Sequence, residues 1–136
     1  MNVLLAGCVI VDDYGRILLL HRSSYRFTGW ELPGGKVEDE EATEAAAVRE
    51  LREELGVDVQ LTGSFGSAEF EDDANDYIYD WFTAKIIAGQ LTIMEPESFD
   101  EYDYFDLDDL MSLALSANMQ VMLDKLYSGE VALGGY

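Results

Sequence analysis

The sequence has little cysteine, proline and positive charge, and each shortage excludes some classes of protein. Its 136 residues include one cysteine, Cys8, and two prolines, Pro33 and Pro96. A single cysteine excludes a disulfide within the chain and is typical of a reducing compartment, so we expect a cytoplasmic protein. The composition is 49% hydrophobic and is interrupted by no repeat, low-complexity tract or linker, which predicts one domain over residues 1–136.

Basic residues number eight against 28 acidic ones, which gives a formal net charge of −20. Binding to nucleic-acid polymers depends on lysine and arginine neutralising phosphates, so this charge excludes that class of partner and also repels anionic membranes. A small anionic ligand would have to arrive together with a metal cation. Composition leaves the oligomeric state open between a monomer and a homodimer.

The N-terminal segment contains a stretch that imitates a secretion signal. Residues 5–8, LAGC, look like a lipoprotein cleavage site, but only seven residues precede the cysteine and none is Lys or Arg. A signal peptide needs a basic start and an apolar stretch of about 7–15 residues. We instead expect two apolar strands, residues 3–11 and 16–22, paired as a buried hairpin across the turn at residues 12–15.

The segment from Ala45 to Leu55 has the composition of a helix, because it lacks Gly and Pro and is followed by Gly56, a typical C-terminal stop. At about 100° per residue, three carboxylates share one face of this helix, those of Glu50, Glu53 and Glu54. An adjacent arc is apolar and should pack on a core; it consists of Ala47, Val48, Leu51 and Leu55.

The acidic face of this helix is unfavourable by itself. Like charges three or four residues apart cost about 0.2–0.5 kcal/mol per pair, and carboxylates in the last turns oppose the helix dipole by a further ~0.3–1 kcal/mol. A cation should therefore sit there, and carboxylate oxygens without His or Cys favour Mg²⁺ or Mn²⁺ over zinc. The alternative is an acidic face that is merely solvated.

Residues 35–57 also match a longer pattern, GX5EX7REUXEEXGU with U aliphatic, at every specified position. The matching residues are Gly35, Glu41, Arg49, Glu50, Leu51, Glu53, Glu54, Gly56 and Val57. A chance match is on the order of one in a million or rarer. On this pattern the chain resembles the Nudix hydrolases. The resemblance implies an α/β fold, the Nudix α/β/α sandwich with a mixed β-sheet, and metal-dependent hydrolysis of a phosphoanhydride.

The resemblance also implies roles for the residues of this box. Glu50, Glu53 and Glu54 would bind Mg²⁺, with Mn²⁺ as a substitute, together with the carbonyl of Gly34. Glu53 and Glu50 are the main candidates for catalysis, and which glutamate acts as the base stays open.

Two more box residues, Arg49 and Glu41, would support the acidic cluster, Arg49 by ion pairing and Glu41 from the loop. Family members often carry a Ser or Thr cap near Glu41. Here Thr43 is the only nearby hydroxyl, so we expect the helix to start a residue late.

An acidic loop about forty residues after the box supplies another metal ligand or base in relatives that cleave nucleoside triphosphates. The segment Glu95-Pro96-Glu97 stands at that distance. Glu97 is the first candidate for the role and Glu95 the second, and the alternative is an acidic surface loop without function.

Three residues are candidates for substrate contacts. Arg22 ends a strand where related triphosphatases place an arginine against the phosphates, and Leu32 stands at the apolar strand end before the glycines. Asn118 falls where the MutT branch uses an asparagine to read an oxidised guanine, since an amide both donates and accepts hydrogen bonds. The alternative for Asn118 is a helix N-cap. His21, the only histidine, is expected to be a strand residue.

The sequence pattern after the box predicts strands followed by two helices. The strands are expected at Val57–Phe70, Tyr77–Ile87, Leu91–Met94 and Tyr102–Leu107, and the helices at Asp108–Leu115 and Asn118–Tyr127. Strands mixed with a long box helix and terminal helices suggest a sheet covered on both faces.

The favoured function is hydrolysis of a nucleoside triphosphate, oxidised or not, to a monophosphate and pyrophosphate. Related ADP-ribose hydrolases tend to carry a proline where Asp72 and Asp73 stand, and dinucleoside-polyphosphate hydrolases tend to carry a tyrosine where Ala74 and Asn75 stand, although Tyr77 is near. Those activities and nucleotide-sugar hydrolysis are the enzymatic alternatives. A nucleotide-sensing domain without turnover is the other class, but such domains usually lose box carboxylates.

Overall fold

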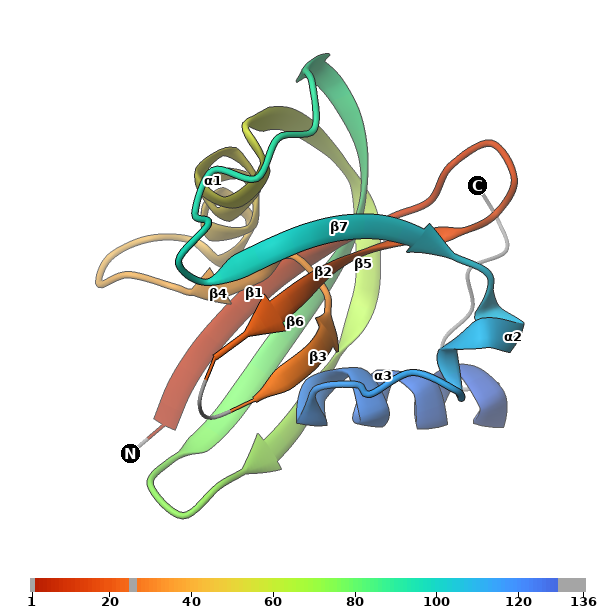
Figure 1. Ribbon diagram of the computed structural model, residues 1–136. Helices are drawn as coiled ribbons and strands as arrows, with labels where there is room; N and C mark the ends of the chain where they lie inside the picture. Colours follow the sequence, from red (N-terminus) through yellow and green to blue (C-terminus); the bar gives the residue numbers. More distant parts are fainter. Residues whose placement is uncertain (1, 25–26, 130–136) are drawn as a thin grey trace.

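The computed structural model describes residues 2–24 and 27–129, which form a mixed α/β fold (Figure 1). In chain order its elements are β1 (Asn2–Ile10), β2 (Ile17–Ser23), β3 (Thr28–Glu31), β4 (Gly34–Lys36), α1 (Thr43–Leu55), β5 (Val57–Glu71), β6 (Asp76–Gly89), β7 (Phe99–Phe105), α2 (Leu107–Leu110) and α3 (Ala117–Ser128). The described helices are all too short or too polar to cross a membrane.

The strands form two sheets that lie between α1 and α3 (Figure 1). The larger sheet has the order β4-β1-β6-β5, and its β1–β6 pair is parallel while its other pairs are antiparallel. The smaller sheet, β3-β2-β7, is antiparallel throughout. The expected α/β/α sandwich with mixed strand directions is therefore confirmed.

The expected hairpin between the first two strands is wrong in its pairing, although both strands exist. β1 and β2 are joined by the turn at Asp12–Arg16 and by an isolated bridge between Val11 and Ile17, and then they enter different sheets. Each strand occupies an interior position, with β1 between β4 and β6 and β2 between β3 and β7. Their apolar runs reflect burial on both faces, which does not specify the neighbouring strand.

The two faces of these strands contribute to two hydrophobic clusters. In β2, Leu18 and Leu20 join the cluster that packs on α1, whereas Ile17 and Leu19 join the cluster that packs on α3. Consecutive strand residues point to opposite faces, so the run ILLL supplies both clusters at once. The predicted apolar arc of α1 is confirmed, with Ala47, Leu51 and Leu55 buried and Val48 packed against the same cluster.

The first two helices differ from expectation in their bounds. Helix α1 begins at Thr43, earlier than expected, and its N-cap residue Ala42 makes no side-chain cap hydrogen bond. The helix expected at residues 108–115 is reduced to the four residues of α2.

The strand expected at Leu91–Met94 is absent from the described structure because its amides have other partners. The N–H of Thr92 donates to the carbonyl of Leu55 at 2.9 Å, and the N–H of Met94 donates to that of Glu54 at 3.1 Å. The segment thus binds the last carbonyls of α1, which would otherwise lack partners.

Candidate active site

The glycine segment after β3 lies directly against the acidic face of α1. The N–H of Gly34 donates to Oε1 of Glu54 at 2.8 Å. A Cβ atom on Gly35 would lie 2.6 Å from the carboxyl carbon of Glu50, so a side chain at this position would collide with the glutamate. Glycine is therefore required for the close approach of backbone and carboxylates.

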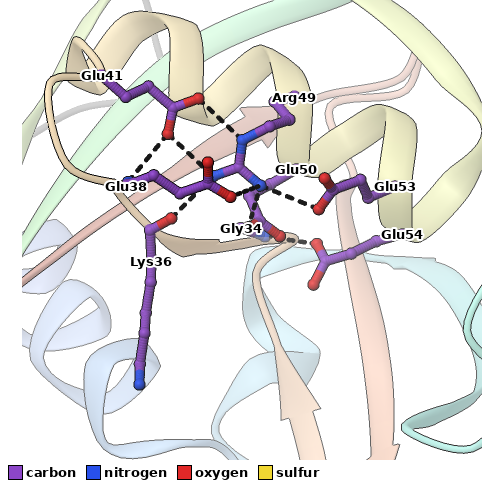
Figure 2. A network of polar contacts seen from close by, with 8 residues as sticks. All are labelled: Gly34, Lys36, Glu38, Glu41, Arg49, Glu50, Glu53 and Glu54. Carbon is purple, nitrogen blue, oxygen red and sulfur yellow. Dashed lines mark hydrogen bonds and ion pairs between the residues drawn. The ribbon is translucent and has the colours of Figure 1, made fainter.

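Arg49 occupies the centre of the acidic network (Figure 2). Its guanidinium donates twice to Glu41, from Nε at 2.8 Å and from Nη2 at 3.0 Å. Nη1 donates to Glu50 at 3.0 Å and to Glu53 at 2.9 Å, and Nη2 also reaches the carbonyl of Lys36. The fork-shaped guanidinium can satisfy several carboxylates at once, which a lysine could not do. The predicted clustering of Arg49 with Glu41 is present.

Glu41 is fixed by the turn that precedes the helix. Besides the two bonds from Arg49, it accepts the N–H of Glu38 at 3.0 Å. These donors, with the side-chain bond from Arg49 as the largest effect, lower the pKa of Glu41 to about 2. The preceding residue, Glu40, has a φ of 65°, in the left-handed region that favours glycine.

Glu54 and Glu50 experience the opposite environment. Glu54 is 3% exposed, and burial raises its pKa well above the usual range, with the charge of Glu50 as the next cause. Burial also raises the pKa of Glu50, against the lowering effect of Arg49. Glu53 is more open, with 47% of its side chain exposed. The sequence places all three on one face but does not indicate that Glu54 is enclosed.

The loop after β6 brings one of its two candidate glutamates to this cluster. The charge of Glu95 contributes to the raised pKa of both Glu50 and Glu54, so its carboxylate lies in their field. Glu97 is exposed and is not among the charges that act most strongly on either residue. The hydrogen bonds of Thr92 and Met94 to the end of α1 hold the loop in this place.

Arg22 lies across β2 and β3 from a further acidic residue that sequence reasoning missed. Its Nε donates to Oε1 of Glu31 at 2.9 Å, and its guanidinium carbon lies 4.6 Å from the ring centre of Phe99. Glu31 also contributes to the raised pKa of Glu54. The signal available in the sequence was an acidic residue directly before Leu32-Pro33-Gly34, at a strand end opposite an arginine.

The other substrate candidates lie on the α3 side. Leu32 is buried in the cluster that packs on α3. The N-cap of α3 is Ser116, whose hydroxyl oxygen accepts the N–H of Met119, so Asn118 is not the cap. Asn118 lies within the first turn, half-buried, and its Oδ1 accepts a hydrogen bond from the Ser116 hydroxyl.

His21 is a residue of β2, as expected, and its Nδ1 lies 2.6 Å from Oδ1 of Asp100. Within residues 2–24 and 27–129, one group of three His, Cys or acidic side chains has its potential metal-ligand atoms within 4.8 Å of one another. It consists of His21, Asp100 and Glu101. The glutamates of α1 form no such trio among the described residues: Arg49 Nη1 donates to both Glu50 and Glu53, whereas Glu54 accepts the Gly34 amide.

The donor chemistry of the box fits a hard divalent cation, although no ready-made cage is present. Around Glu50 and Glu54 the neighbouring charges Glu31, Glu53 and Glu95 are all negative. Arg49 supplies one positive charge to several carboxylates at once. A divalent cation would relieve the remaining repulsion, and carboxylate and carbonyl oxygens are the ligands that Mg²⁺ and Mn²⁺ prefer.

Similarity to known proteins agrees with this geometry. The family model for the NUDIX domain matches residues 1–126. Among solved structures, a MutT NUDIX hydrolase from Burkholderia pseudomallei superposes with a TM-score of 0.83 at 30% sequence identity, covering 93% of this chain and 98% of that one. The likeness therefore extends over nearly the whole chain.

Three curated relatives differ in their named activities. The chain is 44% identical to an 8-oxo-dGTP diphosphatase of Proteus vulgaris, over 40% of this chain and 51% of that protein. It is 34% identical to an ADP-ribose pyrophosphatase of Methanocaldococcus jannaschii, over 77% of this chain and 63% of that protein. It is 30% identical to the nucleoside triphosphatase NudI of Klebsiella pneumoniae, over 87% and 92%. The first two relatives are thus matched over only half to two thirds of their length, but the family match and the shared fold show that this chain belongs to the MutT-like Nudix hydrolases.

Proposed function

We propose that the protein hydrolyses a phosphoanhydride bond of a nucleoside diphosphate derivative, and that its favoured substrate is a nucleoside triphosphate, cleaved to a monophosphate and pyrophosphate. The observation that carries this proposal is the repulsion between buried Glu54 and half-buried Glu50, which lie against Gly34 and Gly35 within a complete Nudix box. Such carboxylates are unfavourable for stability alone and suit a site that binds metal and polyphosphate.

The metal would be held by Glu50, Glu53, Glu54 and the Gly34 carbonyl, and when bound it supplies charge neutralisation at the bridging phosphates and activation of water. Arg49 orients Glu50 and Glu53 by donating a hydrogen bond to each. Glu95 takes precedence over Glu97 as the loop carboxylate, since its charge reaches Glu50 and Glu54.

Arg22 is the side chain proposed to contact the phosphates. Its guanidinium is held by Glu31 and by the ring of Phe99, while about a third of the side chain stays exposed to receive an anion. Because the chain has few cations and a net charge of −20, a triphosphate would enter as its metal complex.

Two of the three relatives described above act on nucleoside triphosphates by name, and one of these two is matched over nearly its full length. The ADP-ribose pyrophosphatase supports the alternative substrate class. Asn118 is the candidate for recognition of the base, because an amide in the first turn of α3 can read a purine edge. Because Ser116 is the N-cap of α3, helix capping does not account for an asparagine at position 118.

The test compares Asn118→Ala with Ser116→Ala on a panel of nucleotides with Mg²⁺. If Asn118 reads the base, Asn118→Ala lowers kcat/KM for the preferred purine triphosphate by roughly 10- to 200-fold and leaves pyrimidine substrates nearly unchanged. Ser116→Ala removes the cap and the hydroxyl that donates to Asn118, so it lowers stability by about 1 kcal/mol and changes the purine-to-pyrimidine ratio less than Asn118→Ala does. An unchanged purine-to-pyrimidine ratio in Asn118→Ala would show that the residue does not contact the base. If ADP-ribose is the one nucleotide of the panel that the protein cleaves, the triphosphate proposal is wrong.

A further inference from the structure

Tyr79 brings a hydroxyl group against the glycine segment of the proposed metal site. The residue lies on β6 and is 3% exposed. A Cβ atom built on Gly34 would lie 2.3 Å from the Tyr79 hydroxyl oxygen, so this oxygen is in contact with the Gly34 backbone. The charge of Glu54 is also the strongest of those that act on the tyrosine.

A second glycine makes room for the same hydroxyl. Gly7 on β1 is the register partner of Gly34 on β4, and a Cβ atom on Gly7 would also lie 2.3 Å from the Tyr79 oxygen. Two residues far apart in the sequence therefore lack side chains at the place where one oxygen atom sits. Any larger residue at either position would displace the hydroxyl or the strand.

The hydroxyl is what distinguishes this residue from a phenylalanine. A phenylalanine would fill the same core without placing an oxygen atom against Gly7 and Gly34. Tyr77, two residues earlier on the same strand, differs because its hydroxyl donates to Asp72 at 2.8 Å.

We infer that Tyr79 is a positioning residue for the divalent metal. Its hydroxyl contacts the Gly34 peptide, whose N–H holds Glu54 and whose carbonyl is the proposed backbone ligand. Removing the oxygen leaves a space beside Gly34, and the peptide gains freedom to move away from the position that serves the metal. The inference rests on the proposed function, since it assigns a role towards the same metal site.

The test measures Mn²⁺ binding to the metal-free protein by the electron paramagnetic resonance of free Mn²⁺, in Tyr79→Phe and in the matched control Tyr77→Phe. Tyr79→Phe is expected to raise the Kd for Mn²⁺ by roughly 10-fold, as outer-sphere changes at metal sites commonly do. The Mg²⁺ concentration that gives half-maximal activity of this variant rises by the same factor, while kcat at saturating Mg²⁺ changes little. The melting temperature without metal changes little, since the aromatic ring keeps its place in the core. Tyr77→Phe leaves the Kd unchanged.

Glu54→Gln is measured beside them to separate the two hypotheses. If Glu54→Gln weakens Mn²⁺ binding but Tyr79→Phe does not, the inference fails and the proposed metal site stands. If neither variant changes the Kd, both fail. Equal weakening in Tyr79→Phe and Tyr77→Phe also overturns the inference, because a general disturbance of β6 would then account for the effect.

Discussion

Two glutamates of the same box, Glu41 and Glu54, lie in opposite electrostatic environments. Glu41 accepts three hydrogen bonds, two of them from Arg49, and its pKa falls to about 2. Glu54 accepts one backbone hydrogen bond, is almost fully enclosed and has a raised pKa. The network around Glu41 is complete within the protein, whereas Glu54 is surrounded by negative charge that the protein itself does not balance. The charge of Glu41 is thus balanced within the protein, and that of Glu54 would be balanced by the metal proposed above.

Removing a carboxylate from the acidic face of α1 is expected to have its largest effect on turnover. Glu53→Gln or Glu54→Gln should lower kcat by at least ~10²-fold, because each removes a carboxylate that is proposed to hold the metal. Glu54→Gln should at the same time leave the metal-free protein as stable as the wild type or more stable, since a buried charge has been removed. Steady-state rates with Mg²⁺ and thermal melts with a chelator measure the two effects.

Glu44→Gln serves as the control for these variants, because Glu44 is an exposed residue of the first turn of α1 whose carboxylate accepts the hydroxyl of its neighbour Thr43. It should retain the wild-type rate. A near-wild-type rate in both Glu53→Gln and Glu54→Gln would remove the α1 carboxylates from the mechanism.

The second effect is stabilisation by the metal. Mg²⁺ or Mn²⁺ at a hundred times its Kd should raise the free energy of unfolding by about 2.7 kcal/mol if the ion binds only the folded state. Glu54→Gln should lose most of this gain, while Glu44→Gln should keep it. Stabilisation that KCl reproduces at equal ionic strength would show general charge screening in place of a site.

The smallest effect concerns the pH dependence of stability without metal. The folded pKa of Glu41 lies below the ordinary value of 4.5, so the stability that Glu41 contributes is present above that pH and is lost as the pH falls toward about 2. The raised pKa of Glu54 has the opposite sign, since acidification through that pKa stabilises the fold.

Urea unfolding at several pH values separates the two contributions. Glu41→Gln should weaken the acid-induced loss, and Glu54→Gln should weaken the gain that acidification brings as Glu54 takes up a proton. Identical pH profiles for the two variants would contradict the contrast between their environments.

The box was predictable from the sequence because its geometry is local. Helical periodicity places Glu50, Glu53 and Glu54 on one face, and the same spacing brings Arg49 to Glu53 one turn along the helix. The apolar arc and the glycine stop at Gly56 follow from the same local rules and are present.

What the sequence left open depends on contacts between distant segments. The run ILLL in β2 indicates a buried strand but not its partners, so the pairing of β1 with β2 was wrong. The choice between Glu95 and Glu97 depends on a loop conformation that is set by amides bonding to the end of α1. The burial of Glu54 likewise depends on how closely the Gly34 segment packs on the helix.

The turn before α1 contains a strained backbone position next to the ion pairs of Arg49. Glu40 adopts a φ of 65°, where a residue with a Cβ atom is disfavoured by about 1 kcal/mol or more and glycine is not. The backbone is held in this shape because Glu41 must reach Arg49 and the N–H of Glu38. Replacing Glu40 by glycine would relieve the strain and remove one of the chain's many negative charges without touching the metal-binding face. The position is thus open to sequence drift and to engineering for thermostability, while its neighbour Glu41 is not.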